Sequence, residues 1–334
     1  MNKNLYICYT YYHLYVSLLE IIYLKKLGYD NNYLIITDHI PKGQEIKDRI
    51  LKNNIVKEIY YVEDLKLRRM IFLNPFYCVF YHIILNFLFK KNNKKLYENF
   101  KNELDLKINM FLDSTTTSHF YIYNFKNINL LEDGTLVYYP RKMILKDYIY
   151  KFLFIPQRVG RDKRINKIRV QNPDKLPKDI IRKGEKLDLK KYEKLLSNEE
   201  KEVLLKIFSV NLKIENKEKL KKKCLLLTQP LSEMDLVSEE EKIRIYQEII
   251  EKFSDYDLYL KKHPRDLTNY PFKIRELDKN FPIELIKLLP NNFFAKVVAI
   301  ESSAIYNLSD IAECINLGFD INDKLYRNIM KDKK

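Results

Sequence analysis

Short apolar runs alternate with longer amphipathic stretches along most of the chain, and the alternation occurs in two series. Runs such as NLYICYT and NYLIIT are typical of buried strands, and the stretches between them carry apolar residues at helical spacing. This order predicts an α/β fold with parallel sheets. In the first series we expect strands at 4–10, 32–37, 57–62, 107–112, 119–123 and 128–131, and helices at 12–27, 43–53 and 68–100.

The two series are separated by a basic, proline-containing stretch in which the pattern weakens. We therefore predict a Rossmann-like domain over 1–150, a linker with connecting helices over 151–220, including one around 189–208, and a second Rossmann-like domain over 221–334. Ser238 followed by Glu241 is a capping-box pattern that marks a helix start. In the second series we expect strands at 223–228, 256–261, 273–277, 296–300 and 312–316, and helices at 238–253, 282–289, 303–309 and 321–331.

Neither series contains a GxGxxG fingerprint or a P-loop. Close approach of the backbone to a pyrophosphate depends on such glycines, so a dinucleotide oxidoreductase is disfavoured. Ligands of open α/β sheets bind outside the carboxyl ends of the strands. We therefore expect two Rossmann-like domains facing a central cleft that holds the ligand.

The composition indicates a folded chain and limits the classes of binding partner. Hydrophobic residues make up 46% and charged residues 31%, which is the profile of a packed globular chain. The net charge of +15 favours anionic partners such as nucleic acid, acidic lipid or phosphorylated substrates, although a coding bias towards lysine explains it equally well. The cysteines form no CxxC pair, which indicates a reducing cytoplasm and no zinc site; they are Cys8, Cys78, Cys224 and Cys314.

One apolar stretch, 70–89, is nearly long enough to span a bilayer and has basic residues at both ends. Asn74, Pro75 and His82 argue against a span. We expect a buried helix or an interfacial helix that lies on an anionic membrane face. No secretion signal is visible at the N-terminus.

The segment KKHPRD directly follows the predicted strand 256–261 and so lies at a carboxyl strand end. His263 can donate a hydrogen bond or a proton near neutral pH, and Pro264 fixes the turn that presents it. Arg265 and the lysines before it would favour a phosphate. The alternative is a solvated basic turn.

Two further segments lie at strand ends of the same domain. TQPLSEMD brings Glu233 and Asp235 near His263, where a carboxylate can act as a general base or simply cap the following helix. In ESSA, Ser302 and Ser303 lie between a strand and a helix, where they can hold a phosphate or act as N-caps.

In the first domain, LEDGT ends a strand. Gly134 allows a tight turn there and directs Asp133 towards the cleft, unless the segment is an ordinary Asp-Gly turn. His13 follows the first strand and is the other residue expected at this edge.

Taken together, CYTYYHLYVSLL, LLEDGT, LLLTQPLSE, KKHPRD and ESSAIYNL resemble glycosyltransferase family 52, which contains bacterial lipooligosaccharide and capsule sialyltransferases. The five segments extend over nearly the whole chain. The resemblance implies a GT-B type fold, a CMP-sialic acid donor and an inverting transfer to a terminal galactose without a divalent metal. It also implies activity at the cytoplasmic face of the inner membrane.

Carried over residue by residue, the resemblance makes His263 the group that assists departure of CMP. It makes Asp235, in preference to Glu233, the catalytic base. The domain 1–150 becomes the acceptor side, with His13 and Asp133-Gly134, and 221–334 the CMP-sugar domain. The remaining donor-binding positions are Gln229, Pro264, Arg265, Glu284, Ser302 and Ser303.

Two alternatives stay open. A member of the same family could use another nucleotide sugar of the UDP-glucose type. A basic nucleic-acid-binding protein would use the stretch 158–169, although no RNP, KH or helix-turn-helix pattern supports it. A homodimer is left open, and nucleic acid is not the expected partner.

Overall fold

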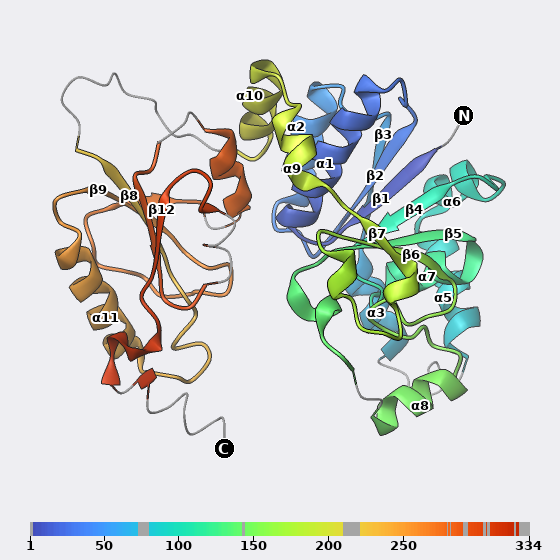
Figure 1. The fold of residues 1–334 in the computed structure, drawn as a ribbon. Coiled ribbons are helices and arrows are strands. Elements are labelled where there is room, and N and C mark those ends of the chain that lie inside the picture. The colour runs from blue at the N-terminus through green and yellow to red at the C-terminus, as the bar shows by residue number, and fades with distance from the viewer. Residues whose placement is uncertain are drawn as a thin grey trace. The chain divides into compact units, whose positions relative to one another are not determined.

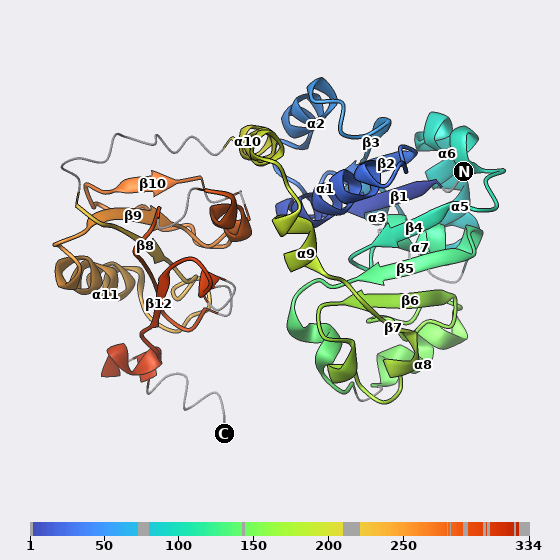
Figure 2. The same ribbon diagram turned by 45° about the horizontal axis from the view of Figure 1, so that its top comes forward.

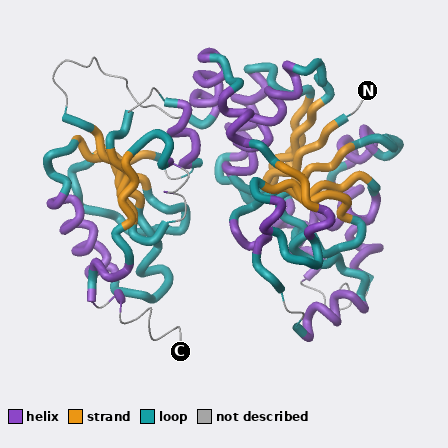
Figure 3. The backbone as a smooth tube through the Cα atoms, viewed as in Figure 1, coloured by secondary structure: helices purple, strands orange, loops and turns teal. Residues whose placement is uncertain are grey.

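The computed structural model describes residues 3–72, 80–141, 144–209, 221–278, 280, 282–289, 293–302, 305, 308–323 and 325–326. The chain forms two compact units, Met1–Glu200 and Lys201–Lys334. In each unit the strands form a central layer with helices outside it, as Figure 1 and Figure 3 show.

The first unit is built on a parallel sheet that has seven strands within the described residues, in the order β3-β2-β1-β4-β5-β6-β7 (Figure 2). Strand β1, between β2 and β4, is buried at every position, which is typical of a parallel sheet covered on both faces. The strands are β1 (Asn4–Cys8), β2 (Asn32–Thr37), β3 (Glu58–Val62), β4 (Lys107–Met110), β5 (Asn127–Leu131), β6 (Ile165–Val170) and β7 (Gly184–Lys186).

Side-chain caps fix where two of the helices beside the sheet, α1 and α7, begin. The Thr10 side chain accepts a hydrogen bond from the backbone N–H of His13 at the start of α1, and Thr115 does the same for Ser118 at the start of α7. Helices α3, α5 and α7 pack on one another, and α1 packs on α9. The helices are α1 (Tyr11–Lys26), α2 (Gly43–Lys52), α3 (Asp64–Phe72), α5 (Tyr81–Asn92), α6 (Lys94–Phe100), α7 (Thr116–Asn124), α8 (Leu145–Phe152), α9 (Leu189–Lys194) and α10 (Asn198–Ile207).

The predicted linker 151–220 is corrected by the structure, because β6 and β7 lie within it and complete the first sheet. Ile165, Ile168 and Val170 are buried in the core, but the basic residues between them hide the strand pattern in the sequence. Arg169 points to the other face and forms a bidentate ion pair with buried Glu20 of α1, at 2.6 and 3.0 Å.

The same finding weakens the nucleic-acid interpretation, because three arginines of the stretch 158–169 are engaged inside the first unit. Their partners are Asp179 for Arg161, Asp162 for Arg164 and Glu20 for Arg169. Guanidinium groups that are paired within the protein are poorly placed to bind the phosphates of a nucleic acid. These arginines instead stabilise the first unit.

Two predicted elements of the first series are wrong. Residues 119–123 were predicted as a strand but belong to α7, whose residues from Thr116 to Ile122 are all buried, so no amphipathic period is visible. The predicted helix 68–100 is divided among α3, α5 and α6, and the residues 73–79 of that stretch lie outside the described ones. Among the residues described, no helix combines the length and the apolar character needed to cross a membrane.

The second unit contains a parallel sheet of five strands, counted over its described residues, in the order β10-β9-β8-β11-β12. The helix α11 (Glu239–Lys252) begins where the capping box predicted, because the Ser238 side chain accepts from the backbone N–H of Glu241 at 3.2 Å. The predicted helix 282–289 is a 3₁₀ helix, Ile283–Leu288. The strands are β8 (Lys223–Leu227), β9 (Asp257–Lys261), β10 (Arg275–Leu277), β11 (Lys296–Ala299) and β12 (Glu313–Asn316).

Candidate active site

Three predicted segments lie together at the carboxyl edge of the second sheet. Strand β8 lies between β9 and β11, so the residues that follow these three strands are neighbours: Gln229 after β8, His263 after β9 and Ser302 after β11. The chain leaves β8 towards β9 and returns on its other side to β11, which makes this edge a topological switch point. Open α/β sheets bind their ligands at such a point.

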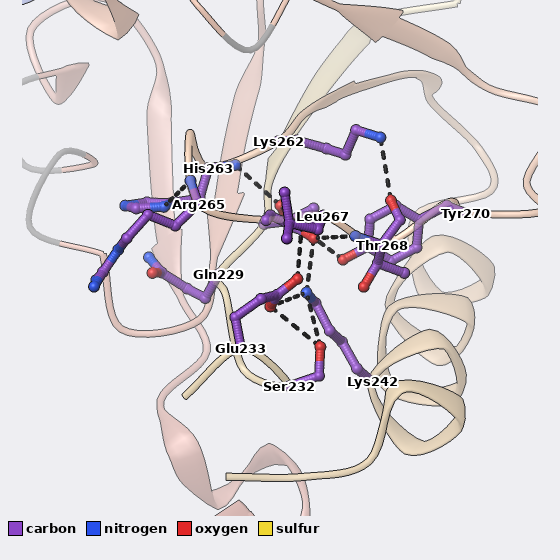
Figure 4. Close-up of polar contacts among 12 residues, drawn as sticks. Gln229, Ser232, Glu233, Lys242, Lys262, His263, Arg265, Leu267, Thr268 and Tyr270 are labelled. Atoms are coloured by element: carbon purple, nitrogen blue, oxygen red, sulfur yellow. Dashed lines mark hydrogen bonds and ion pairs between the residues drawn. The ribbon is translucent and has the colours of Figure 1, made fainter. Parts of the chain in front are cut away.

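A buried ion cluster lies beneath the turn that carries His263. Lys242 of α11 is fully buried, and its Nζ donates to Asp266 at 2.7 Å and to Glu233 at 2.8 Å (Figure 4). A buried charge is tolerated where it is paired and hydrogen-bonded. The cluster therefore ties together α11, the loop after β8 and the turn after β9.

Asp266 is the centre of this cluster and fixes the conformation of the turn. Its carboxylate also accepts from the Tyr270 hydroxyl at 2.9 Å and from the Thr228 hydroxyl. The Thr228 oxygen in turn accepts from the backbone N–H of His263 at 3.2 Å. A continuous chain of hydrogen bonds thus runs from the helix to the backbone of the candidate catalytic residue.

The imidazole of His263 is held in one tautomer. Its Nδ1 accepts from the backbone N–H of Arg265 at 3.1 Å, so in the neutral ring the proton resides on Nε2. Among the described residues Nε2 has no hydrogen-bond partner, so this N–H can donate to a ligand. Burial, together with the charges of Arg265 and Lys261, lowers the pKa of His263 below its usual 6.5.

Of the two candidate bases, Glu233 is engaged within the protein. Its carboxylate accepts from Lys242 and, at 2.7 Å, from the backbone N–H of Leu267. Burial acts to raise the pKa of Glu233, but these hydrogen bonds outweigh it and lower the pKa to about 2. Asp235 is exposed and has a positive φ of 56°, a conformation that non-glycine residues rarely adopt.

The other predicted donor-side residues are spread over the same edge and beyond it. The backbone N–H of Gln229 donates to the Tyr246 hydroxyl at 2.6 Å. Pro264 and Arg265 are exposed on the turn, and Ser302 is buried after β11; Ser303 lies outside the described residues. Glu284 is half-buried in the 3₁₀ helix Ile283–Leu288, where its charge acts on Lys261.

Lys261, at the end of β9, adds a second buried cation to this edge. Burial lowers the pKa of Lys261 to about 8, although the charges of Glu284 and Asp278 act in the opposite direction. Its ammonium group therefore keeps most of its positive charge at pH 7. The sequence pointed to Lys261 as part of the basic turn, and the structure places it inside the domain.

In the first unit, the predicted acceptor-side residues form a histidine–carboxylate pair. His13 is fully buried, with Nδ1 accepting from the backbone N–H of Tyr9 at 3.1 Å and Nε2 bonded to Asp133 Oδ1 at 2.9 Å. Its ring stacks on Phe111, with ring centroids 4.2 Å apart. Gly134 has a φ of 70°, which explains a glycine beside Asp133.

Sequence reasoning missed the residues that hold the turn, namely Thr228, Lys242, Asp266 and Tyr270. One signal was available: Lys242 lies at helical spacing with Ile245, Tyr246 and Ile249, on the buried face of α11. A lysine on such a face needs a buried partner. Within the described ranges, no group of three or more His, Cys, Asp or Glu side chains is arranged to hold a metal ion.

Comparison with known proteins gives one family. Residues 49–317 match the family model of glycosyltransferase family 52. An uncharacterized protein of Haemophilus influenzae (strain Rd) is 29% identical over 181 residues, which are 53% of this chain and 58% of that protein. The match therefore spans little more than half of that relative's length.

Among solved structures, the GT-B domain of a sialyltransferase from Photobacterium damselae is similar, with a TM-score of 0.51 and 12% sequence identity. The similarity covers 99% of this chain and 96% of that one. Another crystal structure of a Photobacterium damsela sialyltransferase gives a TM-score of 0.47 at 14% identity, over 98% of this chain and 78% of that one. The predicted α/β fold of GT-B type, with two Rossmann-like domains, is confirmed.

Proposed function

The chain belongs to glycosyltransferase family 52, and from this premise we propose that it is an inverting sialyltransferase. The donor is CMP-sialic acid, and the acceptor is a terminal galactose of a bacterial surface glycan, lipooligosaccharide or capsule. The observation that supports the proposal most is the setting of His263, whose Nε2–H is left for a ligand while Nδ1 is fixed by Arg265. The positive charges of Arg265 and Lys261 suit a phosphate at the same edge.

In the proposed reaction, the acceptor hydroxyl oxygen forms a bond to the anomeric carbon of sialic acid. The bond from that carbon to the phosphate oxygen breaks, and its electron pair leaves with CMP. His263 donates its Nε2–H hydrogen bond to the departing oxygen, where negative charge develops. Hydrogen bonds aimed at developing charge stabilise the transition state more than the ground state.

A carboxylate takes up the proton of the acceptor hydroxyl, and we propose Asp235 for this role. Glu233 is disfavoured because its pKa of about 2 makes it a weak base and because Lys242 holds it. Ser302 and Ser303 are proposed to hold the donor phosphate, and Glu284 the nucleoside. Gln229 and Pro264 belong to the same donor-binding edge.

The first unit offers a rival base. Asp133 is bonded to a buried, oriented histidine, and its side chain is 39% exposed, so one carboxylate is both fixed and accessible. A base–orienter pair of this kind is a recurring arrangement in acid–base catalysis. We propose His13, Asp133 and Gly134 as acceptor-side residues, and the variants below decide whether Asp133 also removes the proton.

The test is a time course of CMP release from CMP-sialic acid, with and without lactose as the galactose-terminated acceptor, in the presence of EDTA. We expect acceptor-dependent release that survives chelation and is lost in His263→Ala. If CMP stabilises the fold but none is released, the acceptor assignment is wrong. If UDP stabilises the protein against heat and CMP does not, a UDP-sugar donor replaces this proposal.

The base is tested with three isosteric variants in the same assay. Asp235→Asn is expected to lower kcat by roughly 10²–10⁴-fold, whereas Glu233→Gln acts mainly on stability. If Asp133→Asn lowers kcat by that amount and Asp235→Asn does not, the base lies in the first unit. The sialyltransferase proposal itself survives either outcome.

The acceptor class also bears on location. A lipid-linked glycan is assembled at a membrane, so we propose that the protein works at the cytoplasmic face of the inner membrane, bound peripherally. A homodimer stays a prediction that light scattering of the purified protein can check.

A further inference from the structure

Helix α8 presents an apolar stripe to solvent. Leu145, Tyr148, Ile149 and Phe152 follow one another at the i, i+3, i+4, i+7 spacing, and all four are exposed, Leu145 to 78% and Phe152 to 81%. Apolar residues at this spacing normally face a core. The core of the first unit is reached by other residues, since Tyr150 of the helix and Leu153 just after it pack, partly buried, against its main cluster.

Helix α5 repeats the pattern. Phe80, just before the helix, and Ile83 and Phe87 within it lie at i, i+3 and i+7 and are exposed, Phe87 to 63%. The inward side of the same helix carries Tyr81, Leu85 and Phe89, which are buried. Helix α5 is therefore apolar on two sides, of which only one is covered, and α8 presents its one apolar stripe to solvent.

The two stripes belong to neighbouring parts of the first unit. The ring of Tyr123 contacts the ring of His82 in α5, with centroids 4.2 Å apart, and its hydroxyl donates to the carbonyl of Phe154, just after α8, at 2.9 Å. Figure 1 shows α8 at the lower margin of this unit, below α3 and α5. We call these exposed residues the α5–α8 apolar face; they are Phe80, Ile83, Phe87, Leu145, Tyr148, Ile149, Phe152 and Phe154.

Basic residues accompany the α5–α8 apolar face. Arg68 and Arg69 of α3, Lys91 of α5 and Lys151 of α8 are exposed. In the sequence from 139 to 158, five basic residues occur with one acidic residue, Asp147, which is paired with Arg141. Apolar and aromatic side chains bordered by lysine and arginine match the chemistry of an anionic lipid surface.

We propose that the α5–α8 apolar face docks the protein on an anionic lipid bilayer. The apolar stripes enter the boundary between headgroups and acyl chains, and the basic residues meet the lipid phosphates. A second copy of the chain is a poorer occupant, because apposing two such faces would bring like charges together. This docking rests on the proposed function, which supplies the membrane-linked acceptor. The α5–α8 apolar face would bring the enzyme to that acceptor.

The experiment is flotation of the full-length protein with vesicles of equal parts phosphatidylglycerol and phosphatidylcholine, compared with vesicles of phosphatidylcholine alone. The native protein is expected to float with the anionic vesicles and more weakly with the neutral ones. In Leu145→Asp/Phe152→Asp, binding is expected to weaken by more than about tenfold, because two large apolar contacts are lost and two anionic charges are added.

Leu104→Asp is the matched control, because Leu104 is 85% exposed but does not belong to the α5–α8 apolar face. It is expected to float like the native protein. CMP release with soluble lactose is measured on every variant, because lactose needs no membrane. A double variant that still releases CMP but no longer floats supports the docking surface. Native protein that floats but releases no CMP refutes the sialyltransferase proposal and leaves the docking proposal standing.

Three results would overturn the docking proposal. One is native protein that does not bind anionic vesicles. Another is a double variant that floats as well as the native protein. The third is a dimer in light scattering that the double variant dissociates, since the α5–α8 apolar face would then join two copies of the chain.

Discussion

The two units each place a histidine at the carboxyl edge of their sheet, and the two rings are held alike on one side. In both, Nδ1 accepts from a backbone N–H, that of Tyr9 for His13 and that of Arg265 for His263. The other nitrogen distinguishes them. Nε2 of His13 is bonded to Asp133, whereas none of the described residues bonds to Nε2 of His263.

This difference separates a histidine that orients another group from one that is available to a ligand. His13 is fully buried and stacked on Phe111, so it can act only through Asp133. His263 lies on an exposed turn, but the cluster of Lys242 and Asp266 beneath it makes that turn rigid. Rigid support of an accessible group is what catalysis by positioned hydrogen bonds requires.

The largest effect is expected when His263 is removed. His263→Ala should lower the rate of transfer by roughly 10²–10⁴-fold while thermal stability changes little, because the lost group touches the ligand and not the core. His13→Ala should lower Tm strongly, since it empties a buried site beside Phe111, and should lower the rate much less than His263→Ala does. CMP release and differential scanning calorimetry on both variants check this, and an equal loss of rate in both would erase the distinction.

The next effect concerns the support of His263. Lys242→Met leaves the carboxylates of Asp266 and Glu233 without their buried partner and should destabilise the second unit by about 3–5 kcal/mol. Arg244→Met is the matched control on the same helix, because its ion pair with Glu241 is largely exposed on the arginine side and should be worth less than about 1 kcal/mol. Urea denaturation measures both, and similar losses would show that the cluster has no special role.

Much of the fold could be predicted because the strands are short, apolar and regularly spaced. The elements that failed are those whose environment hides the pattern. Residues 119–122 are all buried and so show no helical period, and β6 has lysine, asparagine and arginine between its buried residues. The partner that stabilises Arg169 is Glu20, far away in the sequence, and no local pattern indicates it.

The positions of the candidate site residues at strand ends were predictable, but the contacts that support them were not. Turn residues at strand ends identified His263, Glu233 and Asp133, since loop chemistry is visible locally. The argument against Glu233 as the base depends on its contacts with Lys242 and Leu267, which only the folded chain provides. Likewise, the His13–Asp133 pair joins residues 120 positions apart.

A smaller effect is expected for the pair in the first unit. Asp133→Asn replaces a hydrogen bond to a partly exposed carboxylate and should cost about 0.5–1.5 kcal/mol of unfolding free energy. With an acceptor-side role alone, KM for lactose should rise while kcat changes little. Steady-state kinetics at varied lactose, together with urea denaturation, check both parts, and an unchanged KM would remove Asp133 from the acceptor side.

The smallest effect is a difference in pH dependence. Burial and the charges of Arg265 and Lys261 lower the pKa of His263, so its ring stays neutral above pH 6.5 and is protonated only at lower pH. Since the ring is already neutral there, His263 should cause no loss of kcat/KM as pH rises from 6.5 to 8. At lower pH a loss is expected, because Nδ1 must remain unprotonated to accept the hydrogen bond from Arg265. A decline on the alkaline side that His263→Ala abolishes would instead indicate a protonated imidazole as general acid.

The most direct test of the central claim, that His263 at the carboxyl edge of the second sheet meets the donor phosphate, is a calorimetric titration with CMP. A hydrogen bond to a charged oxygen contributes about 1.5–3 kcal/mol, so the affinity should fall roughly ten- to a hundredfold in His263→Ala. It should be unchanged in Arg244→Met, on the outer side of α11. Equal CMP affinity in the native protein and in His263→Ala would contradict the account.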